Sequence, residues 1–185
     1  MAQDFRGNSN LPIGLRNNNP TNIVPVAGGW QGQVGTDGGF ATFQDVSWGI
    51  RAYVKNLNSS INNHGTATLS EYITRFAPPS ENDTASYIAS VAKDTGLSAD
   101  STLQTDPDSI KKLLRAQMNV ELGKKYADMV SDADISEGIS LANGGAATLF
   151  KATKIFASSH VGYLVVLAGI GGMAAIYLGL SKKKN

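Results

Sequence analysis

The sequence predicts a mainly α-helical domain that starts with short β-hairpins and is followed by one transmembrane helix. The Gly- and Asn-rich residues 1–44 contain short β-like pieces between turn signals. Residues 45–137 contain capped segments with apolar residues at helical spacing. Residues 161–180 form an uncharged apolar run. We therefore expect a soluble domain over residues 1–142, a linker or juxtamembrane helix over 143–160, a transmembrane helix over 161–180 and a basic tail over 181–185.

The composition argues against several classes of function. The 185 residues carry a formal net charge of +1, and no Lys/Arg cluster lies on an obvious recognition helix, so we expect no nucleic-acid partner. The absence of cysteine from the sequence excludes disulfides and thiolate metal sites. Two histidines are too few to favour a histidine-based metal site or a Ser-His-Asp triad. We therefore expect no metal and no cofactor.

The first 44 residues favour one or two short β-hairpins. Their turn signals are Gly28-Gly29 and Asp37-Gly38-Gly39, and the β-like pieces are TNIVPV at 21–26, WQGQV at 30–34 and GFATF at 39–43. GLRNNNPTNI, at 14–23, holds a run of asparagines, which disfavour helix and strand because their amides compete for nearby backbone groups. The residues alone leave open whether this run is a turn or a polar binding surface.

Four helices are predicted between residues 45 and 123, because each segment has its own start and stop signals. The predicted segments are 46–63, capped by Asp45 and ended by Gly65; 68–77, opened by Thr68 and Glu71 at capping-box spacing; a helix from Asn82 or Asp83 to Gly96; and Pro107 to Gly123, capped by Asp106. The segment ISEGISLANGG, at 135–145, predicts a further short helix that leads into the linker.

Val161–Leu180 has the length and composition of a transmembrane helix. Twenty helical residues rise about 30 Å, which matches the hydrocarbon core of a bilayer. Tyrosines lie near both ends, as in an aromatic belt, and Lys182–Lys184 follow at once, which predicts a C-terminus on the cytoplasmic or particle-interior side. A buried core helix is the alternative. Ala168 and Gly172 form a small-xxx-small pair, which leaves open a homo-oligomer through this Gly-rich helix.

Carboxylates and amides are the chemistry that the soluble part offers. Both suit carbohydrate, since sugars need amide hydrogen bonds and aromatic faces, and glycoside cleavage needs a carboxylic acid. Glu121 lies in the last turn of the Pro107 helix, where partial burial would raise its pKa toward that of a general acid; a solvated surface glutamate is the alternative. Glu81, on the Pro-rich loop before the third helix, is the alternate candidate. Trp30, in the Gly-rich region, is the aromatic residue suited to stack on a sugar ring.

Five motifs follow one another over about residues 12–140: GLRNNNPTNI, WQGQ, GFATFQDVSWGIRAYVKNL, RFAPPSENDTASYI and LLRAQMNVELG. In this order they resemble a family of bacteriophage virion proteins, usually described as phage structural proteins and found in phages and prophages. The resemblance implies a lysozyme-like α+β domain directed at peptidoglycan. The segment around Glu121 is similar to the helix that carries the single catalytic glutamate of lytic transglycosylases, and the GLRNNNPTNI segment is similar to one that lines their glycan cleft.

Two functions follow from these expectations. In the first, the chain is a virion protein, anchored in a viral internal membrane or in the host inner membrane during assembly, that opens peptidoglycan locally during genome entry. Glu121 is then the general acid, with Glu81 as its alternate. The substrate-binding residues would be Asn17, Asn18, Asn19, Asn22, Trp30 and Tyr87. In the second, the chain is a non-enzymatic virion protein that links the membrane to capsid or vertex proteins. Other virion proteins are expected partners in both.

Overall fold

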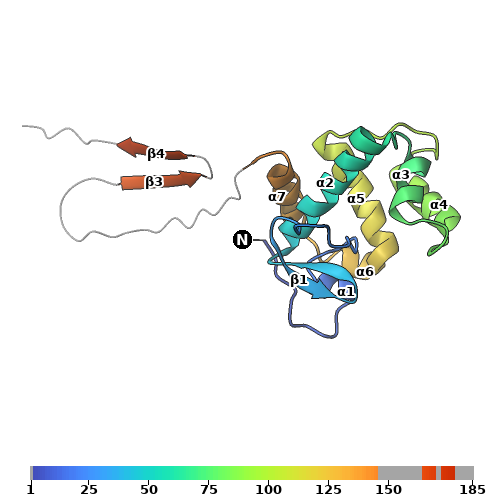
Figure 1. Ribbon diagram of the computed structural model, residues 1–185, viewed down its shortest axis with the longest axis horizontal. Helices are drawn as coiled ribbons and strands as arrows, with labels where there is room; N and C mark the ends of the chain where they lie inside the picture. The colour runs from blue at the N-terminus through green and yellow to red at the C-terminus, as the bar shows by residue number, and fades with distance from the viewer. Residues whose placement is uncertain (1, 146–163, 170–171, 178–185) are drawn as a thin grey trace, which may run out of the picture. The chain divides into compact units, whose positions relative to one another are not determined.

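The fold is that of a computed structural model, which describes residues 2–145, 164–169 and 172–177 (Figure 1). The chain divides into two compact units, Met1–Ala147 and Thr148–Asn185. The elements of the first unit are α1 (Ile13–Arg16), β1 (Gln33–Asp37), β2 (Phe40–Phe43), α2 (Val46–His64), α3 (Leu69–Phe76), α4 (Thr84–Thr95), α5 (Pro107–Leu122), α6 (Lys124–Ala127) and α7 (Asp132–Ala142). The second unit contains β3 (Leu164–Gly169) and β4 (Gly172–Tyr177).

The four helices predicted between residues 45 and 123 are confirmed, because local signals determine where each begins. A side-chain oxygen of the capping residue accepts a backbone N–H in the first turn of every one of them. The caps are Asp45 for α2, Thr68 in a capping box with Glu71 for α3, Asp83 for α4 and Asp106 for α5. Gly65 and Gly96 end α2 and α4 in the left-handed conformation that glycine adopts without strain.

Differences from the prediction lie at both ends of the first unit. One antiparallel hairpin, β1–β2, is present, paired from Gln33 with Phe43 to Asp37 with Phe40. The predicted β-like piece at 21–26 is not a strand, since Ile23 donates its N–H to the Asn19 side chain instead of a strand neighbour. The short helices α1 and α6 were not predicted, and α7 begins at Asp132, ahead of the predicted 135.

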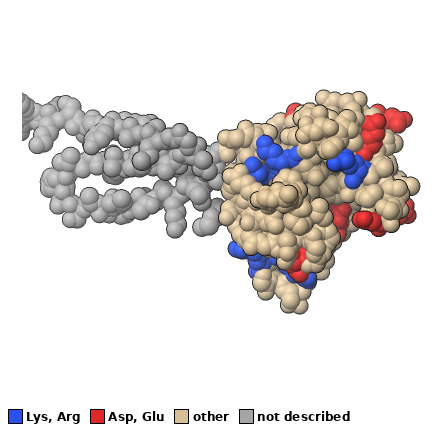
Figure 2. Space-filling model, viewed as in Figure 1, with Lys and Arg blue, Asp and Glu red and all other residues tan. Residues whose placement is uncertain are grey.

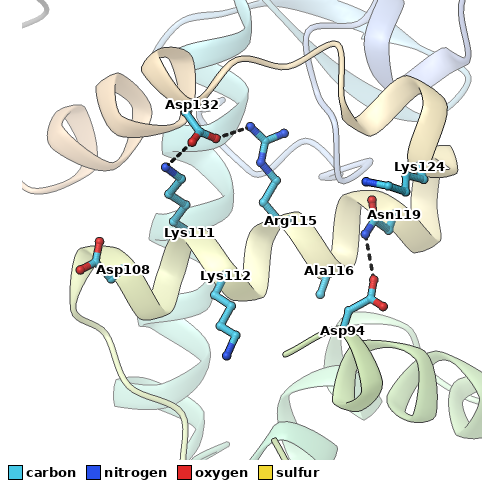
Figure 3. Close-up of a pocket in the computed structure, with 9 residues that line it drawn as sticks. All are labelled: Asp94, Asp108, Lys111, Lys112, Arg115, Ala116, Asn119, Lys124 and Asp132. Carbon is cyan, nitrogen blue, oxygen red and sulfur yellow. Dashed lines mark hydrogen bonds and ion pairs between the residues drawn. The ribbon is translucent and has the colours of Figure 1, made fainter. Parts of the chain in front are cut away.

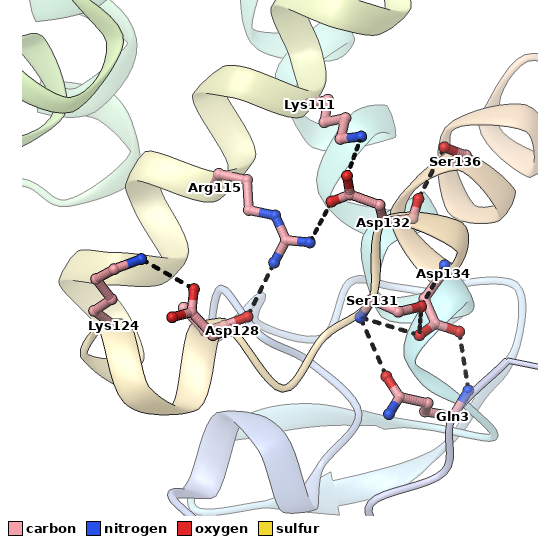
Figure 4. A network of polar contacts seen from close by, with 10 residues as sticks. Gln3, Lys111, Arg115, Lys124, Asp128, Ser131, Asp132, Asp134 and Ser136 are labelled. Atoms are coloured by element: carbon pink, nitrogen blue, oxygen red, sulfur yellow. Dashed lines mark hydrogen bonds and ion pairs between the residues drawn. The ribbon is translucent and has the colours of Figure 1, made fainter.

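A second capping box explains the earlier start of α7. Ser131 and Asp134 bond each other's backbone N–H groups in this box. The N-terminal segment also fixes it: Gln3 donates its N–H to Asp134 Oδ1 (3.0 Å), and its side-chain Oε1 accepts the N–H of Ser131 (3.2 Å) (Figure 4). Asp132 pairs with Lys111 and Arg115 of α5, so α7 is held from two sides (Figure 4).

In the first unit α2 lies among the other helices (Figure 1), and the buried core includes residues of α2, α3, α5 and α7. α2 packs against α7 at close range, because a Cβ on Gly138 of α7 would stand 2.5 Å from the Ile50 side chain. α5 packs against α4, α6 and α7. Large side chains that are fully buried include Leu15, Phe43, Ile50, Tyr53, Leu57, Ile110, Leu114, Met118 and Ile135.

The described residues of the second unit, 164–169 and 172–177, do not form the transmembrane helix predicted over residues 161–180. β3 and β4 form an antiparallel hairpin, paired from Leu164 with Tyr177 to Gly169 with Gly172. The helix prediction is therefore wrong for these strand residues, and so is a Gly-rich helix face for oligomerisation. A continuous apolar run has no period that separates helix from strand, whereas β-branched residues favour strands and glycine weakens a helix.

In the part of the chain that the structure describes, no helix has the length and apolar character needed to cross a bilayer. The rest of the predicted segment (161–163, 170–171 and 178–180), most of the linker and the basic tail lie outside the described residues.

Candidate functional site around Glu121

Glu121 is a half-buried carboxylate in the last turn of α5. Asp106 and Pro107 set the start of this helix, and its apolar stripe, which includes Leu114 and Met118, faces the core. Residues four apart lie on the same face of a helix, so Gln117 stands one turn below Glu121. Gln117 is fully buried, which places an amide group beside the carboxylate.

Two residues distant in sequence hold the carboxylate of Glu121. The Asn22 side chain donates from Nδ2 to Oε2 (2.8 Å), and the Tyr87 hydroxyl donates to Oε1 (2.8 Å). Asn22 lies in the loop after α1, and Tyr87 is a buried residue of α4. The carboxylate therefore joins the N-terminal loop, α4 and α5 at one point.

The hydrogen bonds continue from Tyr87 into the core. Gln117 Nε2 donates to the Tyr87 hydroxyl oxygen (3.3 Å), and the Tyr53 hydroxyl of α2 donates to Gln117 Oε1 (2.6 Å). We call the chain Tyr53–Gln117–Tyr87–Glu121–Asn22 the glutamate relay. Because its inner members are buried, it forms an ordered polar path from the core to the half-buried carboxylate.

Burial is the main cause of the pKa shifts of Glu121 and Tyr87 in the glutamate relay. It raises the pKa of Glu121, and the hydrogen bonds from Asn22 and Tyr87 offset only part of this rise. The position of Glu121 near the C-terminal end of α5 also disfavours a negative charge. Burial first, and the nearby Glu121 charge second, raise the pKa of Tyr87, so its hydroxyl remains protonated. Glu121 is therefore a carboxyl group whose proton is held more tightly than usual, which suits a general acid.

The four asparagines that were predicted to bind substrate fall into two groups in the structure. Asn17, Asn18 and Asn19 are buried, and their amide groups bond internal partners. Their Nδ2 atoms donate to the backbone carbonyls of Asp37, Phe43, Ile23 and Ala41 and to the carboxylate of Asp4. Asn22 alone of the four bonds Glu121. The structure thus brings Asn22 and Tyr87 to the candidate site and leaves the three other asparagines in a structural turn.

Trp30 and Glu81 lie elsewhere. Trp30 packs partly against the core and donates from Nε1 to the carbonyl oxygen of Val24 (2.8 Å). Glu81 is exposed on the turn after α3, where its N–H donates to the carbonyl oxygen of Pro78 (3.0 Å). Among the described residues, the side-chain hydrogen bonds of Glu121 go to Asn22 and Tyr87, and neither Trp30 nor Glu81 takes part in them.

Sequence reasoning missed Gln117 and Tyr53. Gln117 stands between Leu114 and Met118 on the apolar side of α5, and a polar residue at a core position is a signal that it has a buried partner. Tyr53 has no such signal, since its spacing in α2 is that of a core aromatic.

A shallow hollow of about 280 Å³ adjoins the relay. The hollow is lined by Asn82, Asp83, Ser86, Tyr87, Ser90 and Val120. Tyr87 belongs to both the hollow and the relay, and Val120 precedes Glu121 in the chain. Side-chain amides and hydroxyls in such a hollow suit a ligand rich in hydroxyl groups.

A larger cavity, of about 750 Å³, lies along the other side of α5 (Figure 3). Its charged groups include both signs and are largely paired: Asp132 bonds Lys111 and Arg115, and Asn119 donates to Asp94 (2.8 Å). Figure 2 likewise shows separate small groups of basic and acidic side chains on the face that it draws. Within the part of the chain that the structure describes, no group of three His, Cys, Asp or Glu residues could hold a metal ion.

The fold and the relay define a small, mainly helical domain with a half-buried carboxylate at its candidate site, and comparison with known proteins adds its family. No protein-family model matches the chain. Protein P5 of Pseudoalteromonas phage PM2 is 34% identical over 115 residues, which cover 60% of this chain and 71% of the relative. The chain therefore belongs to the family of this phage protein. The expected likeness to phage proteins is confirmed at this level.

Proposed function

We propose that this chain is a phage virion protein that cleaves the glycan strands of peptidoglycan locally during genome entry, with Glu121 as the general acid. The observation that carries the proposal is the state of Glu121: half-buried, with a raised pKa, and held between Asn22 and Tyr87, a residue that also lines the hollow of about 280 Å³. The phage relative supports the virion part of the proposal. The proposal includes that the first part of the chain, residues 1–142, is a lysozyme-like domain.

The chemistry needs one proton donor. Glu121 gives its proton to the glycosidic oxygen while the bond from that oxygen to C1 of the sugar breaks. The 6-hydroxyl oxygen of the same sugar forms a new bond to C1, and its proton goes to the Glu121 carboxylate, which restores the acid. Asn22 and Tyr87 stabilise the carboxylate between these steps, since both donate hydrogen bonds to it.

A zymogram on purified peptidoglycan tests this function with the full chain and two variants. We expect clearing by the wild type and by Glu81→Gln, the matched control at an exposed glutamate, and a loss of about a hundredfold or more for Glu121→Gln. Mass spectrometry of the products should show sugar ends closed by the 6-oxygen. Absence of clearing by the wild type would contradict the enzyme, and clearing by Glu121→Gln at the wild-type rate would contradict the assignment of Glu121.

A second function is favoured by a separate observation. Both oxygens of Glu121 are bonded by donors of the protein itself, from the loop after α1 and from α4. A carboxylate with this environment can have a purely structural role, which is to connect the loop after α1 to α4 by hydrogen bonds. The domain would then be a non-enzymatic virion protein that links a membrane to capsid or vertex proteins. Such a protein would clear no peptidoglycan, and Glu121→Gln would lower its stability.

Association with a lipid membrane is part of both proposals. It is supported by the uncharged sequence of residues 161–180 and the lysines that follow it, not by a helix. Apolar side chains partition into lipid whether or not they are helical, and lysines are attracted to anionic headgroups.

A further inference from the structure

In the side-chain amide of Asn22, the nitrogen has a hydrogen-bond partner and the oxygen has none. Nδ2 donates to Glu121, whereas Oδ1 is buried and has no hydrogen-bond partner. A buried carbonyl oxygen without a donor costs about 1–3 kcal/mol. Asn22 also adopts φ of 53°, in the left-handed region that asparagine enters more readily than most residues. An unpaired group held in this way needs an explanation.

The surroundings of Asn22 Oδ1 contain a second acceptor. A Cβ on Gly14 would stand 3.0 Å from Asn22 Oδ1 and 3.1 Å from the carbonyl oxygen of Asn19. Both oxygens therefore border the space that glycine leaves open at position 14. An amide NH2 in the place of Oδ1 would border the same space as the carbonyl oxygen of Asn19, which is an acceptor.

The other oxygen of Glu121, Oε1, accepts a hydrogen bond from the Tyr87 hydroxyl, and the neighbours of Tyr87 fix the direction of this bond. The contact from Tyr53 to Gln117 is 2.6 Å and that from Gln117 to Tyr87 is 3.3 Å, which fit an O–H···O and an N–H···O bond in that order. Gln117 therefore turns its NH2 toward Tyr87. The Tyr87 hydroxyl, which receives this N–H, directs its own proton to Glu121 Oε1.

We propose that the side-chain amide of Asn22 turns by half a rotation when Glu121 gains or loses its proton. With ionised Glu121, Asn22 Nδ2 donates to Oε2, as the structure shows. With protonated Glu121, the proton lies on Oε2 and is donated to Asn22 Oδ1, while the NH2 group turns toward the carbonyl oxygen of Asn19. The orphan oxygen thus gains a donor in the acid form.

The groups that face Glu121 leave it as the member of this cluster that loses its proton first as the pH rises. They are tyrosines from three helices: Tyr87 of α4, Tyr72 of α3 and, through Gln117, Tyr53 of α2. Burial raises the pKa of all three, so they stay protonated and neutral. Asn22 is consequently a positioning residue that sets which carboxyl oxygen carries the proton. In the glycan cleavage proposed above, on which this last step rests, Oε2 is the oxygen that delivers it.

Nuclear magnetic resonance of the full chain tests this exchange without measuring activity. With carboxyl-labelled Glu and amide-labelled Asn, the Asn22 NH2 signals should shift with the midpoint of the Glu121 titration. On the acid side, an Overhauser contact from the Asn22 NH2 to the Gly14 α protons should appear. The NH2 of Asn18, also at φ of 53°, is the internal control and should not follow this midpoint. No contact to Gly14 at any pH would overturn the proposal.

Two variants give an independent reading of the same exchange. The hydrogen bond that Tyr87 donates to Oε1 is stronger when Glu121 is ionised, so Tyr87→Phe should lower the acid dissociation constant of Glu121 about tenfold. Asn22→Gly keeps the left-handed backbone and removes a group that serves both forms, so the constant should change less than about threefold. An effect of Asn22→Gly as large as that of Tyr87→Phe would contradict the exchange. Because glycan clearing is not used, failure here and failure of the enzymatic proposal are distinguishable.

Discussion

Gln117 has its amide oxygen and its amide nitrogen bonded in the interior, although it sits on the apolar side of α5. The hydroxyl of Tyr53 satisfies the oxygen, and the nitrogen fixes Tyr87. A buried polar network of this kind is stabilising only while each member keeps its partner. The geometry around Glu121 therefore depends on residues that a ligand does not touch.

Removal of the Tyr53 hydroxyl tests this dependence. Tyr53→Phe leaves Gln117 Oε1 buried without a donor, and we expect a loss of about 1–3 kcal/mol in the free energy of unfolding. Urea denaturation measures it. Tyr126→Phe, at a half-buried tyrosine outside the relay, is the matched control and should change stability by less than about 0.5 kcal/mol. Equal effects of the two substitutions would contradict a special role for the inner relay.

The raised pKa of Glu121 predicts a specific dependence of stability on pH. A carboxyl group whose pKa is higher in the folded than in the unfolded state binds its proton more tightly when folded. Its contribution is therefore present below the unfolded pKa and is lost as the pH rises through the folded pKa.

Glu121→Gln removes this titration. We expect the stability of the variant relative to the wild type to increase as the pH rises from the ordinary range of a glutamate carboxyl through the raised pKa of Glu121, because only the wild type must bury a charge at the higher pH. Urea denaturation at several pH values measures this difference. Glu81→Gln, at an exposed position, is the control for the Glu-to-Gln exchange itself. Parallel curves for Glu121→Gln and the wild type would show that Glu121 is not perturbed by folding.

At the scale of elements, the asparagine turn is the contact surface for α2. A Cβ on Gly49 would stand 2.0 Å from the carbonyl oxygen of Asn18, so α2 lies directly on the backbone of the turn. Asn18 in turn bonds the N–H of Phe5 and the carbonyl oxygen of Phe43. The run of asparagines thus connects the N-terminal segment, β2 and α2 through hydrogen bonds and close packing.

Gly49→Ala is expected to separate these elements. Backbone atoms cannot move away as a flexible side chain does, so we expect a loss of about 3 kcal/mol in the free energy of unfolding. Thermal and urea denaturation measure it. Gly35→Ala, in β1, is the control, because no atom lies within 4 Å of the added Cβ. Stability of Gly49→Ala within about 0.5 kcal/mol of the control would show that α2 does not rest on the turn.

At the scale of the whole molecule, the chain has two units with different compositions. The first has a continuous hydrophobic core, and the second contains the apolar hairpin β3–β4. The helical core and its caps suit a domain in water, whereas a run of 20 residues without charge, 161–180, suits lipid.

Flotation with vesicles that contain anionic phospholipid tests the second unit. We expect the full chain to float with the vesicles and a chain without residues 161–185 to stay with the aqueous fraction. Replacement of the lysines at 182–184 by glutamine is the matched control for charge, and it should weaken binding at low salt without abolishing it. Flotation of the shortened chain would place the lipid contact in the first unit.

Helix positions were predictable from the sequence because their causes are local. Asp45, Thr68, Asp83 and Asp106 act within one turn of the helices that they cap, and the apolar period shows which face is buried. The strands at 164–169 and 172–177 were not predictable, since a run that is apolar at every position has no period that separates strand from helix.

The candidate site was predictable only in part. The sequence by itself determined that one carboxylate, Glu121, ends a helix with an apolar face, and that Asn22 and Tyr87 were candidates to accompany it. Only the tertiary structure decided that Asn22 meets Glu121 while Asn17–Asn19 turn inward, and that Gln117 and Tyr53 complete the relay. The physical reason is range: caps and periods act over a few residues, whereas these hydrogen bonds span separations of 99, 64 and 34 residues. Such partners are selected by the packing of whole helices.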